Sequence, residues 1–258
     1  MSIEARLRAR RDEGRKLLVP YITGGLDDEW VDVLRAVTDA GADAVEIGIP
    51  FSDPVMDGPV IQVASQRALA RGASPTSVIT EASKYDGDVP LAVMTYVNLV
   101  GHMGYRRFAA ALSDAGISGA ILPDLPLDEL GPWADAADAH DIETVLLAAP
   151  TTPDDRLRAI CERSRGFVYG VSLMGVTGER TSLAEQAAEM GRRCKAVTDT
   201  PVLLGVGISN AEQAVEASQH ADGVVVGSAL VRRLLEGGGP EAAHAFVAEL
   251  RTALDASS

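Results

Sequence analysis

The sequence predicts an α/β fold in which a single (β/α)8 barrel takes up the whole chain, residues 1–258. Three observations lead to this prediction. Eight short runs rich in Val, Ile and Leu recur along the chain, a segment with helical periodicity follows each run, and 258 residues is a typical length for one such barrel. A doubly wound open sheet of the same units is the alternative architecture, and no linker indicates a second domain.

The eight apolar runs are expected to form parallel strands. Each run is continuous rather than alternating, as in strands that helices cover on both faces. In chain order, the expected strands are Leu17 to Thr23, Ala44 to Ile49, Leu91 to Tyr96, Ala120 to Pro123, Thr144 to Ala148, Phe167 to Ser172, Val202 to Val206 and Gly223 to Val226.

The segments between the strands have a helical pattern with start and stop signals. "DDEWVDVLRAVTDAGAD" begins with acids, continues with Trp30, Val33, Leu34 and Val37 at helical spacing, and stops at Gly41. "GYRRFAAALSDAGIS" and "LDELGPWADAADAHDI" follow the same order, and "PEAAHAFVAELRTALDASS" is expected to be the last outer helix.

Composition and charge exclude several classes of protein. Charges interrupt every apolar run before it reaches the roughly 18 residues of a membrane helix, and the N-terminus lacks the apolar run of a signal peptide, so we expect a cytoplasmic protein. The net charge of −14 argues against binding nucleic acid or an anionic membrane. Cys161 and Cys194 form no CxxC pair and stand beside no His, which argues against a disulfide framework and a thiolate metal site.

The acidic excess has a pattern of its own. The chain contains 21 Asp and 16 Glu but only three Lys, so the Lys and Glu enrichment of hyperthermophiles is absent. A salt-rich cytoplasm, and therefore a halophilic source, would explain this pattern. A GC-rich genome would explain the scarcity of Lys but accounts less well for the excess of Asp, so salt adaptation is the preferred interpretation.

Two carboxylates mark the second strand and the loop after it as a candidate catalytic site. In "VEIGIPFSDPVMDGPVIQ", Glu46 lies inside the strand and Asp57 lies on the loop. Barrel enzymes place catalytic groups at the C-terminal ends of strands and in the loops that follow them. Asp53, next to a proline in the same loop, is expected to shape a turn. Asp124, in "LPDLP" after the fourth strand, is expected to shape a loop or an interface.

Glycines after the last three strands predict a phosphate site. Backbone N–H groups at glycine-rich turns before helices bind anions, and the loops after strands seven and eight are the recurrent phosphate site of barrels. "SLMGVTGER" after strand six adds polar residues that are expected to contact the substrate and to act as a mobile lid. The residues of this predicted site are Gly175, Thr177, Gly178, Gly205, Gly207, Gly227 and Ser228.

Three tyrosines predict an aromatic pocket beside these groups. Tyr21, Tyr96 and Tyr169 all lie at or near strand ends. Their rings can wall a pocket, and their hydroxyls can reach polar groups. Their presence on three different strands favours a pocket over three unrelated core positions.

Elimination favours acid–base chemistry by the two carboxylates, without a metal. A Schiff-base enzyme needs a lysine at the barrel mouth, but Lys16 precedes the first strand, and Lys84 and Lys195 fall on outer helices or their ends. A metal site needs several His or carboxylate ligands, but only His102 among the four His follows a strand. Neither chemistry has well-placed residues.

These motifs resemble those of the tryptophan synthase alpha subunit, from about Leu18 to the C-terminal helix. The most specific segment is "EIGIPFSDPVMDGPVIQ", accompanied in family order by "VPYITGG", "YVNLV", "LPDLP", "VYGVSLMGVTG", "LLGVGIS" and "VVVGSAL". The resemblance implies that Glu46 and Asp57 are the catalytic acids and Tyr169 the active-site tyrosine. It also implies phosphate-binding positions at Gly178, Gly207, Gly227 and Ser228, and an indole pocket lined by Tyr21, Ile61, Met94, Tyr96, Ile121 and Val206.

The reaction that the resemblance implies is the cofactor-free retro-aldol cleavage of indole-3-glycerol phosphate to indole and glyceraldehyde 3-phosphate. Glu46 would protonate the leaving indole carbon and then take the side-chain hydroxyl proton, and Asp57 would accept a hydrogen bond from the indole N–H. The implied partner is a beta subunit that carries pyridoxal phosphate, in an alpha2-beta2 heterotetramer. Two alternatives stay open, namely another phosphate-binding barrel such as a sugar-phosphate isomerase, and a non-catalytic interaction subunit.

Overall fold

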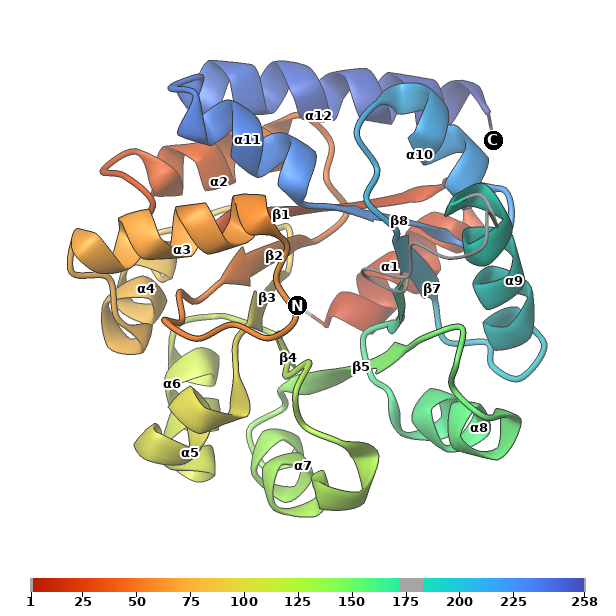
Figure 1. The fold of residues 1–258 in the computed structure, drawn as a ribbon, viewed down its shortest axis with the longest axis horizontal. Helices are drawn as coiled ribbons and strands as arrows, with labels where there is room; N and C mark the ends of the chain where they lie inside the picture. The colour runs from red at the N-terminus through yellow and green to blue at the C-terminus, as the bar shows by residue number, and fades with distance from the viewer. Residues whose placement is uncertain (1, 172–182, 258) are drawn as a thin grey trace.

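The computed structural model describes residues 2–171 and 183–257, and a closed barrel of eight parallel strands lies within them (Figure 1). Each strand pairs with the next one in the chain, and β1 pairs with β8, so the predicted closed barrel is confirmed and the open sheet is wrong. The strands are β1 (Leu17–Thr23), β2 (Val45–Gly48), β3 (Leu91–Met94), β4 (Gly119–Ile121), β5 (Glu143–Ala148), β6 (Val168–Val171), β7 (Val202–Gly205) and β8 (Gly223–Val226).

Every expected strand is present, and β1 and β8 have the expected bounds. Each of the other strands differs from the expected bounds by one or two residues at one or both ends. At the C-terminal ends of β2 and β3, the chain leaves the sheet gradually. Ile49 N still donates to Met94 O at 2.9 Å, and Thr95 N to Ile121 O at 3.1 Å, although both donors lie beyond the strand ends. At these two ends, the apolar run extends slightly further than the regular ladder.

Twelve α-helices surround or close the barrel in the described part of the chain, and none of them is long and apolar enough to span a membrane. Two α-helices follow β2, β3 and β8, one follows each of β1, β4, β5, β6 and β7, and α1 precedes β1. The helices are α1 (Ile3–Asp12), α2 (Trp30–Asp39), α3 (Pro59–Ala70), α4 (Pro75–Ala82), α5 (Val97–Met103), α6 (Tyr105–Asp114), α7 (Gly131–Asp138), α8 (Asp154–Arg163), α9 (Leu183–Lys195), α10 (Ala211–Ser218), α11 (Ser228–Leu235) and α12 (Gly239–Ala256).

The helix α1, which the sequence patterns did not predict, closes the barrel at the N-terminal ends of the strands. Its side chains Ile3 and Leu7 are fully buried in the same interior cluster as Phe167. The carboxylate of Glu143, at the start of β5, accepts hydrogen bonds from Ser2 Oγ at 2.7 Å and from Ile3 N at 2.6 Å. An acidic side chain from a distant strand therefore binds the free N–H groups at the start of α1.

The apolar side chains of the barrel form two layers. One fills the barrel interior, and a larger one lies between the sheet and the outer helices. Because strand residues alternate between these layers, a side chain at the C-terminal end of a strand enters either the barrel mouth or the outer layer. This alternation decides which of the predicted site residues meet.

Candidate active site

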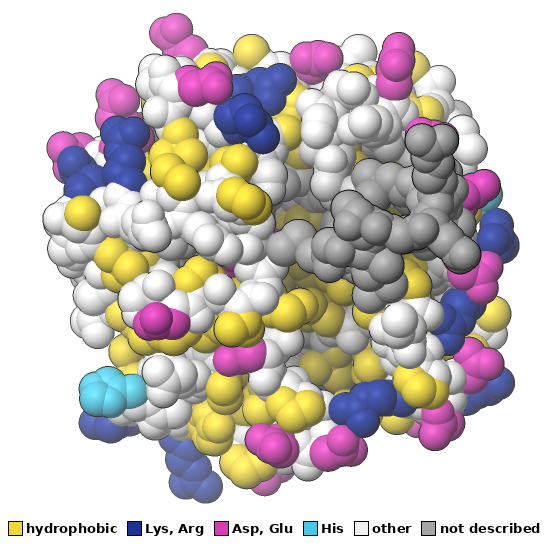
Figure 2. Space-filling view, viewed as in Figure 1, with side chains coloured by type: hydrophobic (Ala, Val, Ile, Leu, Met, Phe, Trp, Pro, Cys, Tyr) yellow, Lys and Arg dark blue, Asp and Glu magenta, His cyan; other side chains and the backbone are white. Residues whose placement is uncertain are grey.

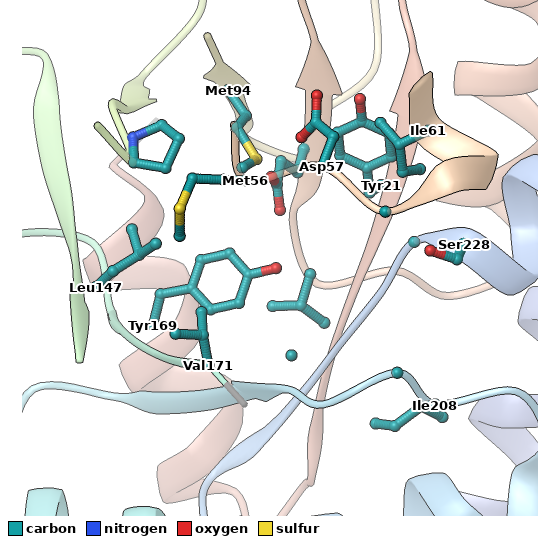
Figure 3. A pocket seen from close by; sticks show the side chains of 17 residues that line it. Tyr21, Met56, Asp57, Ile61, Met94, Leu147, Tyr169, Val171, Ile208 and Ser228 are labelled. Carbon is teal, nitrogen blue, oxygen red and sulfur yellow. The ribbon is translucent and has the colours of Figure 1, made fainter. Parts of the chain in front are cut away.

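A cavity of about 220 Å³ opens where the strands end, and Figure 2 shows the corresponding hollow with hydrophobic side chains around it. Ten residues that the sequence assigned to the site line this cavity: Tyr21, Glu46, Asp57, Ile61, Met94, Tyr169, Gly205, Gly207, Gly227 and Ser228. Seven further lining residues, several of them labelled in Figure 3, were not assigned to it: Met56, Gly58, Pro123, Leu147, Val171, Ile208 and Val225.

Glu46 brings an unpaired carboxyl group to the cavity from within β2. Its side chain is 0% exposed, and neither carboxyl oxygen has a hydrogen-bond partner within the described ranges. Burial raises the pKa of Glu46 to about 8, and the nearby carboxylate of Asp57 adds to the rise. Glu46 therefore holds a proton at neutral pH and can donate it to a bound molecule.

Asp57 approaches the same cavity from the loop between β2 and α3. Pro59 begins α3 two residues after Asp57, and Gln62 Nε2 donates to the backbone oxygen of Asp57 at 2.9 Å, which ties the loop to the helix. Burial raises the pKa of the Asp57 carboxyl, and a hydrogen bond from the Tyr96 hydroxyl lowers it. Since Asp57 is less buried than Glu46 and has this donor, it ionises first, and the pair separates into a proton donor and a carboxylate.

Tyr21 and Tyr169 form walls of the cavity, and glycines on the neighbouring strands make room for their rings. A Cβ atom on Gly48 would overlap the Tyr21 side chain, and a Cβ atom on Gly205 would overlap the Tyr169 ring. Burial raises the pKa of both hydroxyls well above that of a free tyrosine. Figure 3 shows the Tyr169 hydroxyl directed into the cavity, where it remains a neutral hydrogen-bonding group.

Glycine-rich turns after β7 and β8 form the opposite side of the cavity. Gly207 has a φ of +78°, which glycine adopts far more readily than other residues. Gly227 precedes α11, whose first residue is Ser228, so backbone N–H groups at the start of this helix are free of intrahelical partners. Thr177 and Gly178, together with the rest of the expected lid, lie outside the described residues.

Three residues implied to line the pocket occupy other places, and one of them, Tyr96, contacts the backbone of the loop after β2. Val206 packs in the outer layer between sheet and helices, because it lies one position out of phase with Gly205 and Gly207. Ile121 points into the barrel but lies in the interior cluster beneath the cavity. Ile208 lines the cavity instead of Val206.

Some of the missed lining residues had a signal in the sequence. Leu147 pairs with Tyr169 in the parallel register between β5 and β6, and both side chains reach the cavity. Val225 likewise follows Gly223 by two positions on β8. Residues at even spacing toward a strand end share its face, so alternation alone would have named both once the inward phase was known.

The lysines lie away from the cavity, as predicted. Lys16 Nζ donates to the backbone oxygens of Ser218 and Ala221, and Lys195 pairs with Asp222, all near the N-terminal end of β8. Lys84 follows α4 on the outer surface. No lysine is therefore placed to form a Schiff base at the cavity within the described chain.

Comparisons with known proteins show the family of the chain. The family model of the tryptophan synthase alpha chain matches residues 7–256. The tryptophan synthase alpha chain of Streptomyces avermitilis is 46% identical to this chain, and the match covers 95% of this chain and 91% of the relative. The alpha chain of Halorhodospira halophila is 41% identical, and the match covers 98% of this chain and 96% of the relative. Among solved structures, the alpha subunit from Legionella pneumophila is similar, with 34% sequence identity, a TM-score of 0.90 and 99% of both chains covered. A chain of a tryptophan synthase complex from Pyrococcus furiosus is also similar, with 36% identity and a TM-score of 0.83 over 92% of this chain and 98% of that chain.

Proposed function

Since the chain belongs to the tryptophan synthase alpha chain family, we propose that Glu46 and Asp57 are the groups with which it cleaves indole-3-glycerol phosphate. The chain is a lyase of tryptophan biosynthesis, and its family favours this role over a sugar-phosphate isomerase or a non-catalytic subunit. The observation that carries the assignment is the buried, unpaired carboxyl group of Glu46, with a pKa of about 8, beside a second carboxylate.

The chemistry needs a proton at the indole carbon that leaves, because an unprotonated aryl carbanion is a poor leaving group. Protonated Glu46 supplies that proton and, once ionised, accepts the proton of the side-chain hydroxyl as the carbon–carbon bond breaks. Positive charge grows on the indole nitrogen during this step. The Asp57 carboxylate accepts a hydrogen bond from the indole N–H and stabilises that charge in the transition state.

The two sides of the cavity suit the two ends of this substrate. The apolar side, with Tyr21, Ile61, Met94 and Tyr169, is a site for the indole ring. The turns that contain Gly207, Gly227 and Ser228 are a site for the phosphate. Gly178 and Thr177, which lie outside the described residues, stay predicted contacts of the substrate.

Turnover by two variants tests the roles of the carboxylates. Glu46→Gln keeps the shape but cannot transfer a proton, so indole release should fall by about 10²- to 10⁴-fold. In Asp57→Asn, the rate of the chemical step should fall to a small fraction of the wild-type rate. Asp53→Asn is the matched control, because it removes an exposed carboxylate in the same loop that does not line the cavity. Near-normal turnover by Glu46→Gln would falsify the assignment.

The partner that we propose is a tryptophan synthase beta subunit, in an alpha2-beta2 heterotetramer. The chain itself uses no cofactor, and pyridoxal phosphate belongs to the beta subunit. Support comes from three large hydrophobic side chains exposed beside the cavity, namely Val55 (75%), Met56 (43%) and Val63 (52%), and from the Pyrococcus furiosus relative, whose structure is that of a complex. A cytoplasmic location and a single-domain chain remain predictions, to be checked by cell fractionation and limited proteolysis.

A further inference from the structure

Tyr96 connects the catalytic loop to the end of β3. Its side chain is 4% exposed and reaches from the residue before α5 toward the loop that follows β2. The hydroxyl accepts a hydrogen bond from Met56 N at 3.0 Å and makes a hydrogen bond to the Asp57 carboxylate. The ring also packs against Phe51, with 5.0 Å between ring centroids and 30° between ring planes. One side chain therefore contacts the loop near its beginning and near its end.

From these contacts we infer that Tyr96 is a positioning residue, whose hydroxyl holds the Asp57 carboxylate at the cavity in the orientation that the cleavage needs. This inference rests on the proposed function of Asp57. The cavity does not include Tyr96 among its lining residues, so the inferred action on the substrate passes through Asp57.

The direction of the hydrogen bonds follows from what a tyrosine hydroxyl can do. It has one proton to give, and the backbone N–H of Met56 can only donate, so the hydroxyl accepts there and directs its own proton to Asp57. Burial raises the pKa of Tyr96 to about 12. The hydroxyl therefore remains a donor over the whole range of pH in which the enzyme can be assayed.

A carboxylate in the loop after the next strand supports Tyr96 in turn. Asp124, in the loop after β4, accepts a hydrogen bond from Val97 N at 2.9 Å, which holds the backbone directly after Tyr96. Asp124 thus shapes a loop, as expected from the sequence. Loops after β2, β3 and β4 are connected in this way through Asp57, Tyr96 and Asp124.

The charged and titratable groups around Asp57 give the inference a measurable sign. Glu46, Tyr21 and Tyr96 face the Asp57 carboxylate, and the charge of Asp124 acts on the Tyr96 hydroxyl. Among them, the Tyr96 hydroxyl is the group that lowers the pKa of Asp57. Removing it should raise that pKa and move the acidic limb of the kcat/KM profile to higher pH. A residue that only packs against the loop would not move this limb.

The test is Tyr96→Phe, which keeps the ring contact with Phe51 and deletes the hydroxyl. We expect kcat/KM for indole release to fall by about tenfold to a hundredfold, mainly through kcat, as for the loss of a hydrogen bond to a charged group. Tyr85→Phe is the matched control, because its hydroxyl also accepts a backbone N–H, from Val89 at 3.3 Å, but at the other end of the barrel. The control should keep both the rate and the pH profile of the wild type.

The double variant Tyr96→Phe with Asp57→Asn separates this inference from the proposed function. If Tyr96 acts through Asp57, adding Tyr96→Phe to Asp57→Asn should change the residual rate by less than about twofold. The positioning role would be overturned if Tyr96→Phe lowered the rate as much in the Asp57→Asn background as it does in the wild type. A wild-type pH profile in Tyr96→Phe alone would overturn it too. Normal turnover by Asp57→Asn alone would instead refute the proposed role of Asp57.

Discussion

Replacing Glu46 by Gln should lower turnover by about 10²- to 10⁴-fold and at the same time stabilise the fold in alkaline solution. Folded Glu46 keeps its proton up to a pKa of about 8, whereas the unfolded chain releases it at the ordinary value of 4.5. A raised pKa in the folded state gives a stability that is complete below pH 4.5 and is lost as the pH rises through 8. Each pKa unit corresponds to about 1.4 kcal/mol, so the loss is at most about 5 kcal/mol.

The amide in Glu46→Gln does not ionise and therefore escapes this loss. From the two pKa values, the stability advantage of the variant over wild type should grow by about 3 kcal/mol between about pH 5.5 and pH 9. Urea unfolding followed by tryptophan fluorescence measures this difference at each pH. An advantage that does not change with pH would refute the raised pKa, and with it the argument that Glu46 is protonated when substrate binds.

Three further results are expected. Gly205→Ala should displace the Tyr169 ring and lower kcat/KM by about tenfold or more while circular dichroism remains unchanged; unchanged kinetics would remove Tyr169 from the pocket wall. Molar potassium chloride should raise the melting temperature by screening the repulsion of 37 acidic residues, whereas a flat or falling melting temperature would favour genome composition as their cause. A saturating beta subunit should accelerate indole release by ordering the loop that contains Asp57, and an unchanged rate in a confirmed complex would exclude this coupling.

The sequence predicted the barrel well because parallel strands have a local signature. The continuous apolar runs located all eight strands without reference to any distant residue. The helix α1 was missed because its burial depends on Phe167 and Glu143, more than 130 residues away. A short segment with only Ile3 and Leu7 as buried residues has little pattern of its own.

The candidate site shows the same limit at the level of single side chains. Glu46 and Asp57 were found because carboxylates at a strand end and on the next loop are unusual in an apolar context. The sequence did not predict that Ile208, rather than Val206, faces the cavity. The turn at Gly207, whose φ is positive, sets which of the two side chains points inward. The hydrogen bond between Tyr96 and Met56 joins two loops that lie 40 residues apart in the chain. A pattern of neighbouring residues cannot predict a contact over that separation.

The closure of the barrel base by α1 sets an order of events during synthesis. The residues at the start of α1 leave the ribosome before their acceptor Glu143, which is made 141 residues after Ser2. At 5–20 residues per second, α1 must wait for roughly 7 to 28 seconds before its docking site exists. Helix α1 is therefore translated well before it can dock, and a nascent chain halted before β5 would leave Ile3 and Leu7 accessible to chaperones.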